Sequence, residues 1–220
     1  MFQYVLFDLD GTLTDPKTGI TSCVQYALAD AGIEEPDLDN LEPFIGPPLT
    51  DSFREFYGFD DEQIKRAIDK YHERFDEKGI FENEIIEGIP ELLKALKDAG
   101  RRVSIASSKP RPLVIRILEH FEIAQYFDTV VGSEFDGRFA TKEAVVEEAL
   151  KQLVPSVYEK EDVAMVGDHK FDIQGARAHG LTGIGVSFGY AGEHELEDAG
   201  ADYIVDTVEE LQRLLLQGSL

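Results

Sequence analysis

The chain has 220 residues, of which 43% are hydrophobic and 30% charged, so it is long enough for one large α/β domain and a modest second unit. Its 44 acidic and 21 basic residues give a formal net charge of -23, which excludes a general polyanion-binding surface for nucleic acid or anionic lipid. No apolar run approaches the roughly 20 residues of a membrane-spanning helix, and the first residues lack the basic region of a signal peptide, so we expect a cytoplasmic protein.

The chain opens with one predicted strand, and a long helical stretch follows it. Residues 3–7 are apolar β-formers that run into Asp8-Leu9-Asp10-Gly11, a pattern that predicts a buried strand ending at a turn. From about Gly19 to Lys78 apolar residues recur at helical spacing, and the breaks in this pattern fall at Gly32, at Gly46-Pro47-Pro48 and near Gly58. We therefore expect a small all-helical unit, in which Cys23, the single cysteine, is a buried structural thiol.

After Gly88 the pattern alternates between helix and strand. Strands are predicted at residues 102–107, 129–131, 162–166 and 183–186, and helices at 89–99, 110–120, 141–153, 171–179 and 208–216. Strands that alternate with helices of this length indicate a parallel sheet with helices on both faces. The predicted fold is therefore α/β, a doubly wound parallel sheet formed by residues 1–16 and 88–220, with an all-helical insertion at residues 17–87.

Polar residues stand at the expected carboxyl ends of these strands, the edge at which open α/β sheets bind ligands. In chain order they are Asp8 with Asp10, Ser107 with Ser108, Lys142 at the start of a helix, and Asp168 with Asp172. Each feature alone has an ordinary structural explanation, since an Asp-x-Asp pair is typical of turns, serines cap helices and a lone lysine is a solvated charge. Their common position at strand ends favours one shared site.

Three carboxylates in one pocket need a cation. Two like charges about 4 Å apart repel by roughly 4 kcal/mol at an effective dielectric near 20, so Asp8, Asp10 and Asp168 could not all stay ionised together without compensation. Mg²⁺ prefers carboxylate oxygens that also face a phosphate, and Lys142 supplies a further positive charge. Together they would keep Asp8 ionised, and so nucleophilic, beside an anionic substrate.

The same residues resemble the motifs of the haloacid dehalogenase (HAD) superfamily, in its phosphatase branch. Asp8-Leu9-Asp10-Gly11-Thr12-Leu13-Thr14-Asp15 resembles the first motif, and Gly167-Asp168 with Asp172 resembles the fourth. Ser107 stands where the second motif has Ser or Thr, and Lys142 where the third has Lys. The likeness spans nearly the whole chain, and it implies that residues 1–16 and 88–220 are the catalytic core and residues 17–87 the mobile cap of the phosphoglycolate phosphatase-like group.

A narrower likeness links the chain to a bacterial subgroup labelled as phosphoglycolate phosphatases or 5′-nucleotidases. It rests on Ile45-Gly46-Pro47-Pro48-Leu49, Ser107-Ser108-Lys109-Pro110 and Met165-Val166-Gly167-Asp168. His169 stands where this subgroup has Arg, and we expect it to be a surface residue.

The resemblance implies a Mg²⁺-dependent phosphatase that hydrolyses a small phosphorylated metabolite, of the phosphoglycolate or nucleotide type, through an aspartyl-phosphate. Asp8 would be the nucleophile and a metal ligand, and Asp10 the acid–base group whose backbone carbonyl also binds the metal. The remaining implied roles are phosphate binding by Ser107, Ser108 and Lys142, metal binding by Asp168, and support of the metal site by Asp172.

Two alternatives remain open, a sugar phosphomutase of the same superfamily and a non-catalytic binding protein. Phosphomutases typically have Glu-Asp where this chain has Gly167-Asp168, and degenerate binding proteins are expected to lose Asp8, Asp10 or Lys142. In the helical insertion the candidate substrate contacts are Phe44, Arg54, Tyr71, Arg74 and Lys78, for each of which ordinary packing or a solvated charge is an equal explanation.

Overall fold

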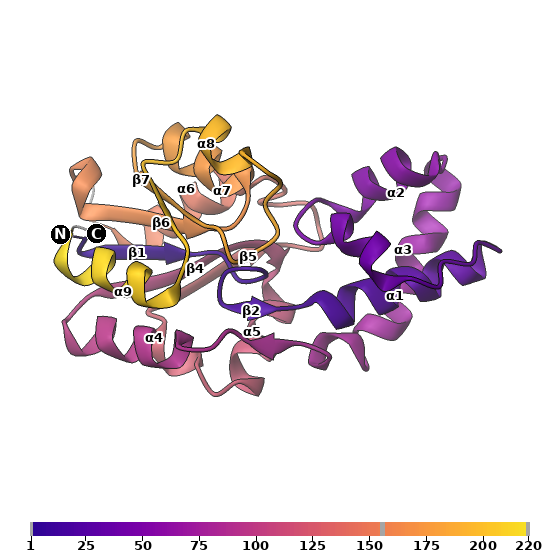
Figure 1. Ribbon diagram of the computed structural model, residues 1–220, viewed down its shortest axis with the longest axis horizontal. Coiled ribbons are helices and arrows are strands. Elements are labelled where there is room, and N and C mark those ends of the chain that lie inside the picture. The colour runs from indigo at the N-terminus through magenta and orange to yellow at the C-terminus, as the bar shows by residue number, and fades with distance from the viewer. Residues whose placement is uncertain (1, 155–156, 219–220) are drawn as a thin grey trace. The chain divides into compact units, whose positions relative to one another are not determined.

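The computed structural model describes residues 2–154 and 157–218, which fall into two compact units (Figure 1). The sheet unit consists of Met1–Thr14 with Ile85–Leu220, and the helical unit consists of Asp15–Glu84. The chain passes between them through β2 (Thr14–Asp15) and β3 (Glu84–Ile85), which pair as a separate two-stranded sheet. The assignment of these units as catalytic core and cap stays a prediction.

Six parallel strands form the sheet of the first unit, in the order β5-β4-β1-β6-β7-β8. Their bounds are Thr129–Ser133 (β5), Arg102–Pro110 (β4), Tyr4–Phe7 (β1), Val163–Gly167 (β6), Thr182–Val186 (β7) and Tyr203–Val205 (β8). The apolar β1 lies in the interior of the sheet, with Phe7 opposite Ile105 of β4 on one side and Val166 of β6 on the other. This register brings the carboxyl ends of the three strands to the same edge, directly beside Asp8. The predicted α/β fold with a parallel sheet is confirmed.

Helices cover both faces of this sheet (Figure 1). The helices α6 (Lys142–Leu153), α7 (Lys170–Ala178) and α8 (Glu195–Ala199) lie on one side, and α4 (Ile89–Asp98), α5 (Arg111–His120) and α9 (Val208–Gln217) on the other. Two short 3₁₀ helices, η3 (Ala124–Tyr126) and η4 (Lys160–Asp162), precede β5 and β6. Leu6 and Met165 of the sheet pack with Val146 of α6 and Ala176 of α7 in a buried apolar core, and this packing fixes the helix starts that carry site residues.

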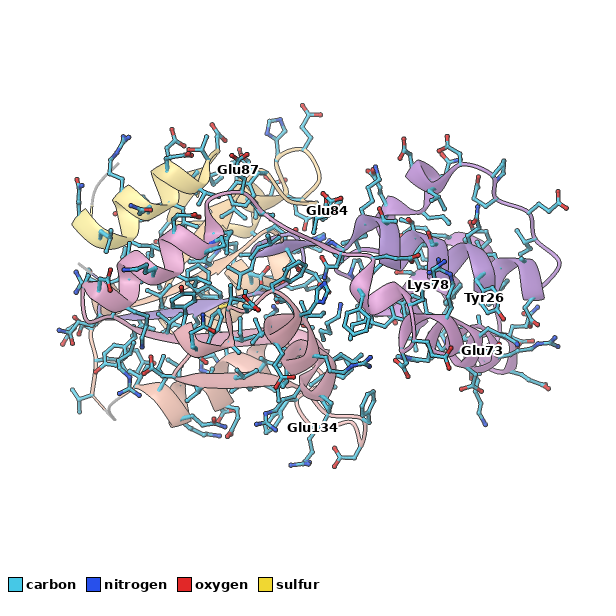
Figure 2. The ribbon with its side chains drawn as sticks, turned by 90° about the horizontal axis from the view of Figure 1, so that it is seen from below. Tyr26, Glu73, Lys78, Glu84, Glu87 and Glu134 are labelled. Atoms are coloured by element: carbon cyan, nitrogen blue, oxygen red, sulfur yellow. The ribbon has the colours of Figure 1, made fainter. Side chains whose placement is uncertain are left out.

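The helical unit consists of α1 (Lys17–Asp30), η1 (Leu38–Phe44), α2 (Leu49–Tyr57), α3 (Asp61–Phe75) and η2 (Gly79–Phe81). The predicted helical stretch is thus present, and Cys23 is buried as expected. Tyr26 of α1 donates a hydrogen bond of 2.8 Å to Glu73 of α3 (Figure 2). The candidate substrate contacts of this unit all have local structural partners: Phe44 packs on Phe53, Tyr71 stacks on Phe75, Arg54 pairs with Asp61, and Arg74 and Lys78 pair with Glu82.

Not every feature of the sheet unit was predicted. The five residues of α8 and the three of β8 are too short to produce a periodic pattern. The second strand was predicted to end at Ser107, whereas β4 continues to Pro110. Its pairing with β5 is irregular there, because Ser108 and Lys109 are inserted between the consecutive pairs Ser107–Gly132 and Pro110–Ser133. Within the described residues, no helix is both long and apolar enough to cross a bilayer.

Candidate active site

A tight turn directly after β1 carries the first two candidate carboxylates. The Asp8 N–H donates to the Val166 carbonyl at 2.9 Å, and Gly11 N–H donates to the Thr14 carbonyl at 2.7 Å. Gly11 has a φ of 76°, and a Cβ atom there would lie 2.0 Å from Oδ2 of Asp168. Only glycine satisfies both conditions, so the Asp-x-Asp-Gly sequence sets the position of this turn against Asp168.

Three carboxylates come together at this edge of the sheet. Asp8, Asp168 and Asp172 each offer an oxygen atom that lies within 4.8 Å of those of the other two. Asp168 is 1% exposed and Asp172 is fully buried. Oδ1 of Asp8 and Oδ1 of Asp172 both face the ammonium of Lys142. Three carboxylates this close together, each offering an oxygen atom, fit a metal ion that prefers oxygen ligands.

Asp168 is held by two donors from distant parts of the chain. Thr12 Oγ1 donates to its Oδ1 at 3.3 Å, and the Tyr190 N–H donates to its Oδ2 at 2.9 Å. Burial, followed by the negative charges of Asp172 and Asp8, raises the pKa of Asp168 to about 7. In the absence of an ion, this carboxyl therefore holds a proton near neutral pH far more readily than an ordinary aspartate does.

Asp172 lies in the first turn of α7, where the His169 N–H donates to its Oδ2 at 3.0 Å. Burial raises the pKa of Asp172 to about 6, against the attraction of the neighbouring Lys142 and with the repulsion of Asp8. A Cβ atom on Gly167 would lie 2.0 Å from Cγ of Asp172, so glycine is required at this last position of β6 for the carboxylate to fold back against the strand.

Lys142 is the buried cation of the site. Its helix begins there because the Thr141 side chain caps α6 and accepts the Ala144 N–H at 3.3 Å. The ammonium lies 2.8 Å from Oδ1 of Asp8 and 2.7 Å from Oδ1 of Asp172, and it donates to the Ala106 carbonyl at 3.1 Å. Burial disfavours its charge, but the carboxylates of Asp172 and Asp8 outweigh burial and raise the pKa of Lys142 well above its ordinary value. Lys142 therefore stays positively charged between two carboxylates.

Ser107 and Ser108 lie at the carboxyl end of β4, beside the Asp8 turn. Ser107 is 2% exposed and its Oγ accepts the Lys109 N–H at 3.3 Å. The Ser108 side chain is exposed, and the Ser108 carbonyl accepts the Ser133 hydroxyl at 2.7 Å. Among the described residues, no hydrogen bond joins either hydroxyl to the three carboxylates. Both serines thus lie at the same edge of the sheet as the carboxylate cluster, and their role in phosphate binding stays a prediction.

Lys109 is a site residue to which sequence reasoning gave no role. Its ammonium forms an ion pair with Oδ2 of Asp10, and the two side chains are only 8% and 15% exposed. Lys109 lies in the irregular part of β4, and such irregularities commonly redirect side chains next to active sites. The sole signal in the sequence was its place directly after the two serines.

The expectation that His169 is a surface residue is wrong. Its side chain is 12% exposed, and its Nδ1 lies 2.7 Å from Oε1 of Glu195. Burial would lower the pKa of His169, but the carboxylates of Asp168 and Glu195 outweigh it and raise that pKa. Glu195 has its pKa lowered, because the Lys170 N–H and His169 outweigh the effect of burial. Both residues therefore belong to the surroundings of the carboxylate cluster.

Several known proteins resemble this chain over most of its length. Residues 5–186 match the family model described as haloacid dehalogenase-like hydrolase. A 5′-nucleotidase of Pseudomonas aeruginosa is 45% identical over 196 residues, which is 89% of this chain and 87% of the relative. The tyrosine-protein kinase PtkA of Mycobacterium tuberculosis is 38% identical over 216 residues, 97% of this chain and 72% of the relative. A crystal structure of a predicted phosphatase from Clostridium acetobutylicum has a TM-score of 0.91 and 46% identity, over 99% of each chain.

Proposed function

The chain belongs to the haloacid dehalogenase-like hydrolases, as a phosphatase of that family, and we propose that it hydrolyses small phosphomonoesters with Mg²⁺ through an aspartyl-phosphate on Asp8. One observation carries this proposal. The Lys142 ammonium lies 2.8 Å from Asp8 and 2.7 Å from Asp172, in a cluster that Asp168 completes. A nucleophile, a fixed cation and an oxygen-only metal site are the parts that phosphoryl transfer to a carboxylate needs.

Asp8, Asp168 and Asp172 are the side chains that would hold the metal, with the backbone carbonyl of Asp10 as a further ligand. The cluster fits Mg²⁺ because its side-chain donors are all carboxylate oxygens, the ligand type that this ion prefers. When bound, Mg²⁺ supplies positive charge that neutralises the carboxylates and the phosphoryl oxygens.

In the first step, a carboxylate oxygen of Asp8 attacks phosphorus and the bond from phosphorus to the ester oxygen breaks. Asp10, in its protonated form, gives its proton to the leaving oxygen, which departs as an alcohol and leaves Asp10 as a carboxylate that can pair with Lys109. Lys142 stabilises the negative charge on Asp8 and on the transferring phosphoryl group, and the Ser107 hydroxyl, with Ser108 nearby, donates to phosphoryl oxygens.

In the second step, water attacks the phosphorus of the aspartyl-phosphate. Asp10, now a carboxylate, takes a proton from that water, and the bond between phosphorus and Asp8 breaks to release inorganic phosphate. The Asp8 carboxylate is regenerated beside Lys142, so the cycle closes with the residue in its starting state.

The proposed substrates are small, with nucleoside monophosphates as the first class to test. The support for this class is the 45% identity to a protein named a 5′-nucleotidase. We further propose that the helical unit acts as a cap that limits access, because it is inserted into the chain directly after the Asp8 turn. A small substrate under a cap would be shielded from bulk water during transfer.

The proposal is tested by measuring phosphate release from a panel of phosphorylated metabolites with Mg²⁺ and, in parallel, with EDTA. We expect Mg²⁺-dependent turnover of at least one nucleotide or small phosphomonoester, and loss of that turnover in EDTA. Conversion of a hexose 1-phosphate to its 6-phosphate without net phosphate release would favour the mutase instead. A third assay measures transfer of a phosphoryl group to a tyrosine peptide, the activity in the name of PtkA.

A further inference from the structure

The turn at residues 168–172, which runs from the end of β6 into the first turn of α7, carries two of the three clustered carboxylates, Asp168 and Asp172, and a later segment of the chain lies directly against it. That segment is the loop between β7 and α8, residues 187–194, which contributes the Tyr190 N–H to Oδ2 of Asp168 at 2.9 Å. A Cβ atom on Gly189 would lie 2.3 Å from Cβ of Asp168 and 2.5 Å from the Gly11 carbonyl oxygen. The loop backbone is therefore in direct contact with both the Asp168 side chain and the turn after β1.

Glu195, the first residue of α8, joins this loop to the turn. Its Oε1 accepts the Lys170 N–H at 2.9 Å and lies 2.7 Å from Nδ1 of His169. Its Oε2 is 3.4 Å from the Gly192 N–H, within its own loop. The side chain is 17% exposed, so these contacts are made largely out of water. One carboxylate thus binds two consecutive residues of the turn and one residue of the loop.

These contacts have a physical reason. Lys170 is the first residue of α7, and the first N–H groups of a helix have no partner within that helix. Glu195 supplies the acceptor, and its negative charge is favoured at the positive end of the helix. The same helix end positions the His169 N–H that donates to Asp172 at 3.0 Å. Removal of Glu195 would release the N-terminus of α7 and, with it, the orientation of Asp172.

We propose that Glu195 is a positioning residue for the metal centre, which holds Asp168 and Asp172 in the arrangement that Mg²⁺ requires by binding the turn to the 187–194 loop. Buried carboxylates that repel one another keep such an arrangement only when their neighbours hold them. The inference rests on the proposed function, since it assigns a role toward the same ion. It adds a residue 23 positions beyond Asp172, outside the four sequence motifs.

The test compares Mg²⁺ binding by the wild-type protein, Glu195→Ala and Glu195→Gln, using calorimetric titration of the metal alone into metal-free protein. Glu197→Ala is the matched control, because Glu197 is an exposed residue of the same helix and its substitution removes the same charge. We expect Glu195→Ala to raise the Mg²⁺ dissociation constant about 10- to 100-fold. Glu195→Gln keeps one oxygen that can accept the Lys170 N–H, so its increase should be smaller, and Glu197→Ala should match the wild type.

Turnover gives the second readout. For Glu195→Ala, saturating Mg²⁺ should restore most of kcat, and the KM for substrate should stay near the wild-type value. A purely structural role would lower the melting temperature of the metal-free variants and leave the Mg²⁺ dissociation constant unchanged, and that result would overturn the inference. If Glu195→Ala does not fold, Glu195→Gln decides by the same measurement. Failure of the wild-type protein itself to bind Mg²⁺ would reject the proposed metal centre, whereas tight binding by all variants would reject only the role of Glu195.

Discussion

The ammonium of Lys109 pairs with the carboxylate of Asp10, a residue 99 positions earlier in the chain. Asp10 is the proposed acid–base group, so this ion pair fixes the side chain that must reach the leaving oxygen. The two groups meet because the irregular end of β4 lies beside the turn after β1.

Replacement of Lys109 by Met should impair catalysis with poor leaving groups more than with good ones. A positioned general acid contributes about 10²- to 10⁴-fold, and a misoriented Asp10 should lose a large part of that factor. Nitrophenolate needs little protonation, so nitrophenyl phosphate should be affected less than an alkyl phosphate. The measurement is kcat for both substrates, and Lys109→Arg should recover part of the loss. Equal losses on the two substrates would contradict a role of Lys109 through Asp10.

Replacement of Lys142 by Met should destabilise the protein as well as inactivate it. The change leaves Asp8, Asp172 and Asp168 buried together without a fixed cation, and removal of one partner of a buried ion pair costs about 3–5 kcal/mol. The free energy of unfolding from denaturant titration of the metal-free protein measures this effect. Lys151→Met is the control, because Lys151 pairs with Glu147 on the exposed face of the same helix and should change stability little. Similar losses in the two variants would refute the assignment of Lys142 as the site cation.

Mg²⁺ should stabilise the protein more at high pH than at low pH. In the folded protein without metal, burial and neighbouring charges raise the pKa of Asp168 to about 7 and burial raises that of Asp172 to about 6, whereas both have a pKa of about 4 when unfolded. Between about pH 4 and pH 7 the folded state therefore binds more protons, so the contribution of these groups to stability falls as pH rises. Mg²⁺ must displace those protons, so its binding strengthens over the same range.

Measurement of the melting temperature at about pH 5 and about pH 8, with and without Mg²⁺, checks this pH dependence. The increase caused by Mg²⁺ should be clearly larger at the higher pH, and Asp168→Asn should abolish most of it. An increase of equal size at both pH values would argue against a metal site built on these two carboxylates.

Substitution of Leu49 tests the proposed role of the helical unit. Leu49 is the first residue of α2 and is only partly buried, and the exposed Gly46, with a φ of 103°, stands three residues before it in the chain. If the unit selects substrates, Leu49→Ala should shift the ratio of kcat/KM between two metabolites by about 1–3 kcal/mol, roughly 10- to 200-fold. Acetyl phosphate, a minimal donor, should be affected much less, and Thr50→Ala serves as the neighbouring control. Comparable efficiency on a folded phosphoprotein and on the best metabolite would contradict a selective cap.

The sheet and the carboxylate cluster could be predicted because their signals are local. A predicted strand that is followed directly by Asp or Ser can be recognised in the sequence. Parallel strands bring their carboxyl ends to one edge of the sheet, which is why Asp8, Lys142, Asp168 and Asp172 are found together. Gly11 and Gly167 belong to the same local motifs, but the aspartates that need the space there are Asp168 at Gly11 and Asp172 at Gly167, which only the structure shows.

The remaining contacts depend on tertiary structure. Lys109 meets Asp10, and His169 meets Glu195, across segments that are far apart in the sequence, and no periodic pattern marks such contacts. A histidine beside a motif reads as solvated until the helix that covers it is known. For the same reason Tyr190 could not be assigned, because it contributes a backbone N–H, which every residue except proline possesses.

The most direct test of the account is phosphomonoester turnover by Asp8→Asn with saturating Mg²⁺, on the substrate that the wild-type protein hydrolyses best. Asn keeps the shape of Asp8 but lacks the nucleophilic carboxylate, so we expect a folded protein with no detectable turnover, given that enzymes exceed the uncatalysed hydrolysis of such esters by up to about 10²¹-fold. Asp98→Asn, at an exposed site on α4, should retain wild-type activity. A correctly folded Asp8→Asn protein that still releases phosphate would contradict the aspartyl-phosphate mechanism.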